Sequence, residues 1–132
     1  MNTSEQIDFG RRYATAWCSQ NAASVAAFYE DNGSLQINGG PPSIGRAAIT
    51  AAAQSFMTAF PDMVVSMDEM SAVEGGAIFR WTLVGTNTGP GGTGNRVRIS
   101  GYEQWNFGES GLVSESKGHF DEADYQRQLS AK

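Results

Sequence analysis

Cysteine and histidine are almost absent from this chain of 132 residues, and each scarcity argues against a class of protein. The single cysteine, Cys18, cannot form an internal disulfide, and it excludes any metal site built from several cysteines. The single histidine, His119, argues in the same way against a histidine-rich zinc site. We therefore expect a protein that works without a metal or another cofactor.

Basic residues and long apolar runs are also scarce. Nine Lys and Arg against fourteen Asp and Glu give a net charge of −5, and no basic cluster occurs, which makes nucleic acid or an anionic membrane a poor partner. No apolar run approaches the ~20 residues of a membrane-spanning helix. The N-terminus lacks the basic-then-apolar pattern of a signal peptide. The expectation is one domain over residues 1–132, located in the cytoplasm.

The stretch from residue 77 to residue 120 dominates what is present. Two alternating runs, Ala77–Thr88 and Val97–Phe107, flank the turn-rich Gly89–Asn95, and a tight turn at Gly108–Gly111 leads into Leu112–Phe120. Alternation with β-branched and aromatic residues predicts strands, and glycine-rich breaks at this spacing predict hairpins. Strands of this length favour a strongly curved antiparallel sheet. The concave face of such a sheet can hold a ligand.

The odd-numbered positions of the first two runs form the predicted buried face, because successive side chains of a strand alternate between faces. They are Phe79, Trp81, Leu83, Gly85, Asn87, Val97, Ile99, Gly101, Glu103, Trp105 and Phe107. One carboxylate, Glu103, therefore lies among aromatic and aliphatic neighbours, where burial would raise its pKa and let it donate a hydrogen bond as a neutral acid. A shift of the parity by one would instead pair Glu103 with Arg80, Arg96 or Arg98.

The N-terminal third predicts two helices and a short strand. The spacing of Thr3 and Gln6 in Thr3–Gln6 fits a capping box that opens the first helix. That helix places Tyr13 and Trp17 on one face. A second helix is expected over Ala22–Tyr29, followed by a turn and a brief strand at Ser34–Ile37.

A third helix, Arg46–Phe60, follows a loop at Gly39–Ser43 and has an uninterrupted apolar face. The residues of that face are Ile49, Ala52, Ala53, Phe56, Met57 and Phe60. A strand over Met63–Val73 precedes the long strands, and Asp121–Leu129 is expected as a short helix or turn. Helices first and a strand meander afterwards predict an α+β roll, with the third helix closing one side of a conical apolar cavity.

Four sequence motifs carry a resemblance to a known family. They are F-P-D-M (Phe60–Met63), G-T-N-T-G (Gly85–Gly89), T-G-N-R-V-R-I-S-G (Thr93–Gly101) and the final Q-L (Gln128–Leu129). With the order of elements, they resemble the SnoaL-like polyketide cyclases of the nuclear transport factor 2-like superfamily, to which the ketosteroid isomerases also belong. The resemblance implies a cone-shaped roll around a pocket. It implies less about the reaction, because this fold hosts isomerases, cyclases, dehydratases and non-enzymes.

The acid/base position of the family can be placed in two ways. Cyclases of this family end the last strand with a run like E-H-W-D, whose aspartate is the acid/base. Aligned without gaps from the Q-L ending, Glu115–Gly118 occupies this run, and the family's aspartate falls on Gly118. A shift of three residues matches His119–Asp121 instead, which makes Asp121 and His119 the candidate proton shuttles. Capping of the final helix by Asp121 and a structural role for His119 are the simpler alternatives.

The resemblance to the ketosteroid isomerases implies a hydrogen-bonding pair for a carbonyl oxygen. Tyr13 and Glu103 occupy the places of the tyrosine and the acid that form the oxyanion hole there, so we expect them within hydrogen-bonding distance of each other or linked through one water. The isomerase's general base would fall at Ile37–Asn38, and neither residue is a base. Two functions follow as alternatives: a cyclase-like or isomerase-like enzyme acting on a hydrophobic carbonyl compound, or a binding protein that kept the pocket without the chemistry.

Two further expectations concern the ligand and the assembly. The side chains expected to contact a small hydrophobic ligand of polyketide or steroid type are Trp17, Phe56, Phe79, Trp81, Asn87, Trp105 and Ser116. The even-numbered positions on the outer face of the sheet are less polar than a solvated face should be, among them Ile78, Thr82, Val84 and Tyr102. This face is therefore expected to form a homodimer.

Overall fold

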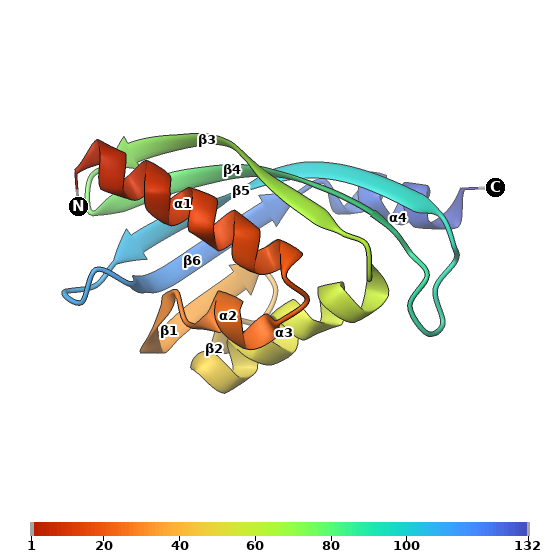
Figure 1. Cartoon of the computed structure of the whole chain (residues 1–132), viewed down its shortest axis with the longest axis horizontal. Coiled ribbons are helices and arrows are strands. Elements are labelled where there is room, and N and C mark those ends of the chain that lie inside the picture. Colours follow the sequence, from red (N-terminus) through yellow and green to blue (C-terminus); the bar gives the residue numbers. More distant parts are fainter. Residues whose placement is uncertain (1, 132) are drawn as a thin grey trace.

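Six strands form one curved sheet in the order β2-β1-β6-β5-β4-β3 (Figure 1). A computed structural model describes residues 2–131. The helices are α1 (Thr3–Cys18), α2 (Ala22–Ala26), α3 (Arg46–Ala59) and α4 (Glu122–Ser130), and the strands are β1 (Tyr29–Ile37), β2 (Ser43–Ile44), β3 (Val64–Val73), β4 (Gly76–Thr86), β5 (Arg96–Phe107) and β6 (Val113–Phe120). All neighbouring strands are antiparallel except β1 and β6. The predicted α+β roll is confirmed.

Helices cover the concave side of the sheet. Helix α1 runs across it and packs against β3, while α3 lies with α2 against β1 (Figure 1). Gly10 lets α1 approach closely, because a Cβ at this position would lie 2.7 Å from Sδ of Met67. Helix α3 buries Ile49, Ala53 and Met57 on its inner face. No helix within residues 2–131 has both the length and the apolar character needed to cross a membrane.

The predicted parity of β4 and β5 is confirmed. Phe79 and Glu103 are buried and paired across the two strands, whereas the even-numbered Arg80 and Gln104 are exposed. Thr82 is an exception, since it is buried on the outer face by hydrogen bonds to Asp68 (2.6 Å) and Ser100 (2.7 Å). Glu103 therefore points inward, away from the arginines of the outer face.

The predicted start of α1 is wrong by one residue. The capping box is formed by Asn2 and Glu5: the Asn2 side chain accepts from the Glu5 amide at 2.8 Å, and the Glu5 carboxylate accepts from the Asn2 amide at 3.2 Å. Asparagine is at least as good an N-cap as threonine, and glutamate serves as well as glutamine at the third position. Both registers satisfy the pattern, so spacing alone does not distinguish them.

The predicted boundary between α2 and β1 is also wrong. Helix α2 ends at Ala26, and β1 begins at Tyr29 and runs through Asp31–Gly33, where a turn was expected. The strand pairing is irregular between Tyr29 and Ser34, which absorbs these turn-forming residues. Arg46 of α3 holds the segment, donating to the Tyr29 carbonyl oxygen at 2.9 and 2.8 Å and pairing with Asp31 at 2.9 Å. The expected loop before α3 likewise contains the two-residue β2.

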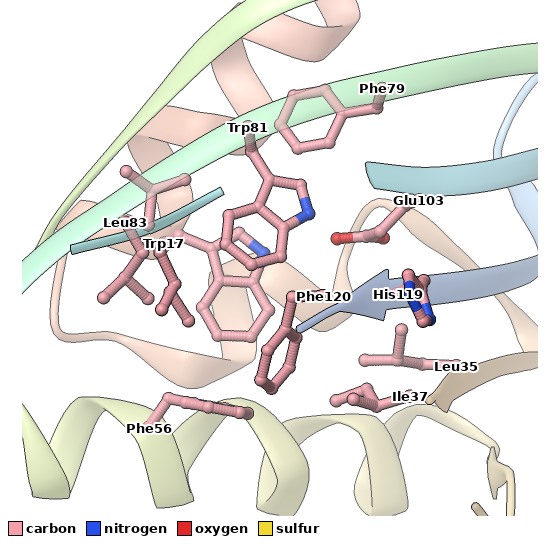
Figure 2. Close-up of a pocket in the computed structure, with 13 residues that line it drawn as sticks. Trp17, Leu35, Ile37, Phe56, Phe79, Trp81, Leu83, Glu103, His119 and Phe120 are labelled. Atoms are coloured by element: carbon pink, nitrogen blue, oxygen red, sulfur yellow. The ribbon is translucent and has the colours of Figure 1, made fainter. Parts of the chain in front are cut away.

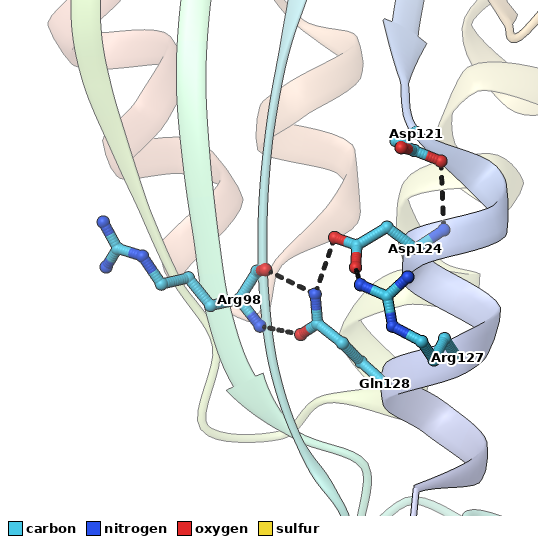
Figure 3. Close-up of polar contacts among 5 residues, drawn as sticks. All are labelled: Arg98, Asp121, Asp124, Arg127 and Gln128. Atoms are coloured by element: carbon cyan, nitrogen blue, oxygen red, sulfur yellow. Dashed lines mark hydrogen bonds and ion pairs between the residues drawn. The ribbon is translucent and has the colours of Figure 1, made fainter.

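The Q-L motif anchors α4 to the free edge of β5. Strand β6 ends at Phe120, so Arg98 has no strand neighbour on that side. The Gln128 amide takes the place of a strand: its Oε1 accepts from the Arg98 amide at 2.7 Å, and its Nε2 donates to the Arg98 carbonyl at 2.9 Å (Figure 3). Asp121 caps the helix by accepting from the Asp124 amide at 3.0 Å. The terminal helix expected from the sequence is confirmed.

Candidate active site

The concave face encloses a cavity of about 50 Å³ with an aromatic wall (Figure 2). Its lining residues come from α1, β1, α3 and all four long strands: Trp17, Leu35, Ile37, Phe56, Val65, Phe79, Trp81, Leu83, Ile99, Glu103, Gly118, His119 and Phe120. Glu103 is the one carboxylate among them, and Figure 2 shows its carboxyl group turned toward the aromatic side chains. The cavity is thus an apolar space with one acid in its wall.

Four uncharged donors converge on one oxygen of Glu103. Oε1 accepts from Ser116 Oγ at 2.7 Å and from Trp105 Nε1 at 3.0 Å. It also accepts from the hydroxyl groups of Tyr13 at 3.0 Å and Tyr29 at 3.2 Å. Oε2 has a single partner among the described residues, the Tyr13 hydroxyl at 3.2 Å. The predicted contact between Tyr13 and Glu103 is confirmed, and the side chain is 6% exposed.

Tyr13 and Tyr29 form a linked pair behind the carboxyl group. Their hydroxyl oxygens are 2.8 Å apart, and both side chains are 0% exposed. Burial raises the pKa of each phenol well above its usual value, and the nearby charge of Glu103 raises it further. Both residues therefore remain protonated, and because each hydroxyl has one proton, one donates to the other while the second donates to Glu103.

Burial also raises the pKa of Glu103, although the hydrogen bonds from Trp105, Ser116, Tyr13 and Tyr29 oppose the shift. Within residues 2–131, no Lys, Arg or His side chain forms an ion pair with this carboxyl group. The predicted alternative of an arginine partner is therefore wrong. Because the donors gather on Oε1, a proton on the neutral acid belongs on Oε2. Glu103 can then donate to a ligand oxygen.

The structure divides the predicted ligand contacts into three groups. Trp17, Phe56, Phe79 and Trp81 line the cavity. Trp105 and Ser116 do not line it but bind Glu103 from behind. Asn87 lies elsewhere, at the end of the β4–β5 hairpin, where its Nδ2 donates to the Ala59 carbonyl at 3.2 Å and its Oδ1 accepts from the Thr93 amide at 2.8 Å. The structure does not bring Asn87 to the ligand space.

The two predicted proton shuttles lie at the margin of the site. His119 borders the cavity, but its exposed ring turns to the outer face and lies 5.8 Å from the ring of Tyr102, centroid to centroid. The exposed Asp121 carboxylate caps α4 and does not line the cavity. Gly118, which takes the family's aspartate position in the gapless alignment, lines the cavity directly opposite Glu103. The structure therefore joins Tyr13 to Glu103 and leaves Asp121 apart.

Tyr29 is the site residue that the sequence reasoning missed. The sequence pattern placed it at the end of a helix. To predict its place on the inner face of β1, Asp31–Gly33 would have to be recognised as an irregular part of a strand. The isomerase base position is occupied by Ile37, which lines the cavity, and by Asn38, whose Oδ1 accepts from the Phe120 amide at 2.9 Å. Among residues 2–131, no three His, Cys, Asp or Glu side chains are grouped so that they could hold a metal ion.

The curved sheet and its enclosed cavity define a ketosteroid isomerase-like roll of the nuclear transport factor 2-like class. The chain belongs to the SnoaL-like polyketide cyclase family, whose sequence model matches residues 7–129. The resemblance noted from the sequence motifs is confirmed. No curated protein sequence matches the chain.

Solved structures support the same fold at low sequence identity. A putative SnoaL-like polyketide cyclase from Jannaschia sp. CCS1 superposes with a TM-score of 0.79 at 15% identity, covering 100% of this chain and 99% of its own. A hypothetical protein from Catenulispora acidiphila DSM 44928, solved with trimethylamine, gives 0.82 at 11% identity and coverage of 99% and 96%. The epoxide hydrolase/cyclase-like enzyme SalBIII, of pyran ring formation in the polyether salinomycin, gives 0.79 at 15% identity and coverage of 93% and 95%.

Proposed function

We propose that this protein is a cofactor-free acid/base enzyme of the cyclase or isomerase type that acts on a small hydrophobic carbonyl compound. The observation that carries the proposal is the buried carboxyl group of Glu103, held in an aromatic wall by four uncharged donors and forming no ion pair with any described residue. Glu103 would bind the carbonyl oxygen of the substrate, while the Tyr13 hydroxyl holds its carboxyl group from behind. Membership of a polyketide cyclase family supports this class of substrate.

The chemistry follows from where charge develops. When a proton leaves the carbon next to a carbonyl group, negative charge accumulates on the oxygen, and a donor already in place stabilises it. Neutral Glu103 provides such a donor on Oε2, and Tyr13 holds the carboxyl group in position. The proton must pass to a base. Asp121 and His119, at the margin of the site, remain the proposed acceptors.

A non-catalytic binding protein is the second candidate, and one observation favours it. The two inward positions where relatives are expected to carry the base hold Gly118 and Ile37, and both line the cavity. Such a protein would bind the carbonyl compound through the same Tyr13–Glu103 pair without removing a proton. The two candidates therefore share the ligand and differ only in turnover.

Exchange of the α-protons of 2-butanone for deuterium in D₂O, followed by NMR, separates the two candidates. An enzyme accelerates the exchange over buffer, and Tyr13→Phe slows it, because the Glu103 carboxyl group loses the hydroxyl that holds it in position. Tyr102→Phe is the matched control, since it removes a tyrosine hydroxyl from the outer face. If the ketone shifts the indole NH signals of the cavity tryptophans while exchange stays at the rate in buffer, the protein is a binding protein.

A homodimer through the outer face of the sheet is part of the proposal. This face carries a groove of about 340 Å³ lined by Asp62, Val64, Ser66, Asp68, Thr82, Val84, Gly85, Arg96 and Arg98. The acidic side chains lie toward β3 and the basic ones on β5. Within the described part of the chain, none of the four charged residues forms an ion pair. A two-fold axis would bring the acidic half of one copy onto the basic half of the other, as an isologous interface requires.

Charge reversal tests the dimer. Arg98→Glu and Asp68→Lys, each alone, place like charges across the two-fold axis and are expected to give monomers in sedimentation analysis. An equimolar mixture of the two variants restores opposite charges in a heterodimer and should recover the dimeric mass. A dimer that survives both single changes would place the interface elsewhere, and a wild-type monomer at micromolar concentration would contradict the dimer itself.

A further inference from the structure

We propose that Trp81 sets the size of the ligand, and this inference rests on the proposed binding of a carbonyl oxygen by Glu103. Trp81 lies on the inner face of β4 and lines the cavity. Its ring packs edge-on against Phe120, with 6.0 Å between the ring centroids (Figure 2). The indole therefore narrows the cavity between Glu103 and the lining residues Leu83 and Ile99, which lie further along β4 and β5.

Gly101 fixes the position of the indole. It pairs with Trp81 across β4 and β5. A Cβ at position 101 would lie 2.3 Å from the His119 carbonyl oxygen, 2.8 Å from Cζ2 of Trp81 and 3.0 Å from Cβ of Phe120, so the β6 backbone and the indole both require glycine here. The missing side chain is thus the space into which the indole and Phe120 pack. A larger residue at this position would have to displace the β6 backbone as well as Trp81.

The volume that remains is small. A space of about 50 Å³ is roughly three to five times the minimum that holds one water molecule, whereas a cavity known to bind benzene measures about 150 Å³. Trp81 is the largest of the half-buried side chains around the cavity, the others being Ile37 and Phe56. Removal of its ring should therefore enlarge the cavity most while leaving the fully buried side chains of the core in place. A ligand with its oxygen at Glu103 has room for a short apolar chain and meets the indole beyond it.

A series of 2-alkanones from acetone to 2-nonanone measures this limit. Affinity is read from NMR titration of the indole NH signals, with Trp17 and Trp105 as reporters in every variant. In the wild type, each methylene group should strengthen binding about fourfold until the chain reaches Trp81, after which affinity stops rising. In Trp81→Ala, the chain length at which affinity stops rising, here called the break, should increase by several carbons. Trp81→Phe should shift the break by fewer carbons. This variant keeps an aromatic ring, so it provides the test if the alanine variant does not fold.

Phe9→Leu is the matched control. Phe9 is buried at 3% exposure among Phe28, Trp105 and Phe107 and does not line the cavity. This change should lower stability and leave the break where it is. A break at the same chain length in the wild type and both Trp81 variants would overturn the size limit alone. If no ketone shifts an indole signal in any variant, the proposed function fails and the size limit fails with it.

Discussion

Replacement of Glu103 by leucine is expected to lower the free energy of unfolding by about 3–6 kcal/mol, because each stranded buried donor costs about 1–3 kcal/mol. The donors left without their acceptor are the Ser116 hydroxyl, the Trp105 indole and the two linked tyrosines. Glu103→Gln is the matched control. Its amide oxygen can accept the same hydrogen bonds as Oε1, and its NH₂ group replaces a protonated Oε2. Urea denaturation of both variants at neutral pH measures the difference.

The pH dependence of stability, compared between the wild type and Glu103→Gln, reports the ionisation of Glu103. Burial raises the pKa of this carboxyl group in the folded protein, so the folded state holds the proton more tightly than the unfolded chain. Its stabilising contribution is complete below the unfolded pKa and is lost as the pH rises through the folded pKa. The stability of the wild type relative to Glu103→Gln should therefore fall as the pH rises from the unfolded pKa of about 4 through the raised folded pKa. A difference that stays constant over this range would mean that Glu103 is not an acid with a raised pKa.

Local pattern was sufficient to predict the sheet. In β4 and β5 the alternation continues for eleven and twelve residues, and glycine turns mark the ends, so the buried face and the inward direction of Glu103 follow from parity. The boundary of β1 could not be predicted in the same way. Asp31–Gly33 has the composition of a turn, and the hydrogen bonds from Arg46 to the Tyr29 carbonyl that hold it in the strand come from a distant helix. Tertiary contacts overrode local preference there.

The donors around Glu103 show the same limit at the site. Tyr13 could be proposed from the resemblance to the isomerases, but the donor role of Ser116 depends on the register of β5 against β6. That register places Ser116 opposite Trp105, after an irregularity between Asn106 and Phe107. A shift by one residue would turn Ser116 to the outer face, and nothing in the spacing of the turn excludes it. The four-donor arrangement therefore becomes visible only in three dimensions.

Gly118→Asp is expected to leave the fold intact and to make its stability strongly dependent on pH. Gly118 lies opposite Glu103, at the position of the family's aspartate in the gapless alignment. A Cβ there would meet the Gln36 carbonyl oxygen at 3.4 Å and Cγ of Glu103 at 3.6 Å, which are ordinary contacts. The backbone has no need to move. The new carboxyl group would stand beside Glu103 in the wall of the cavity.

Two neighbouring carboxyl groups in an apolar wall resist ionising together, so the aspartate should raise the pKa of Glu103 further. Each added pKa unit makes the loss of stability between acidic and alkaline pH larger by about 1.4 kcal/mol. Thermal melts of Gly118→Asp and the isosteric Gly118→Asn across this range measure the effect of the charge alone, and parallel melts would contradict the proximity of the two groups.

In the 2-butanone assay, the aspartate also places a base next to the carbonyl donors. Under the proposed function it should therefore speed α-proton exchange above the wild-type rate at a pH where one of the two carboxyl groups is ionised, whereas the asparagine should not.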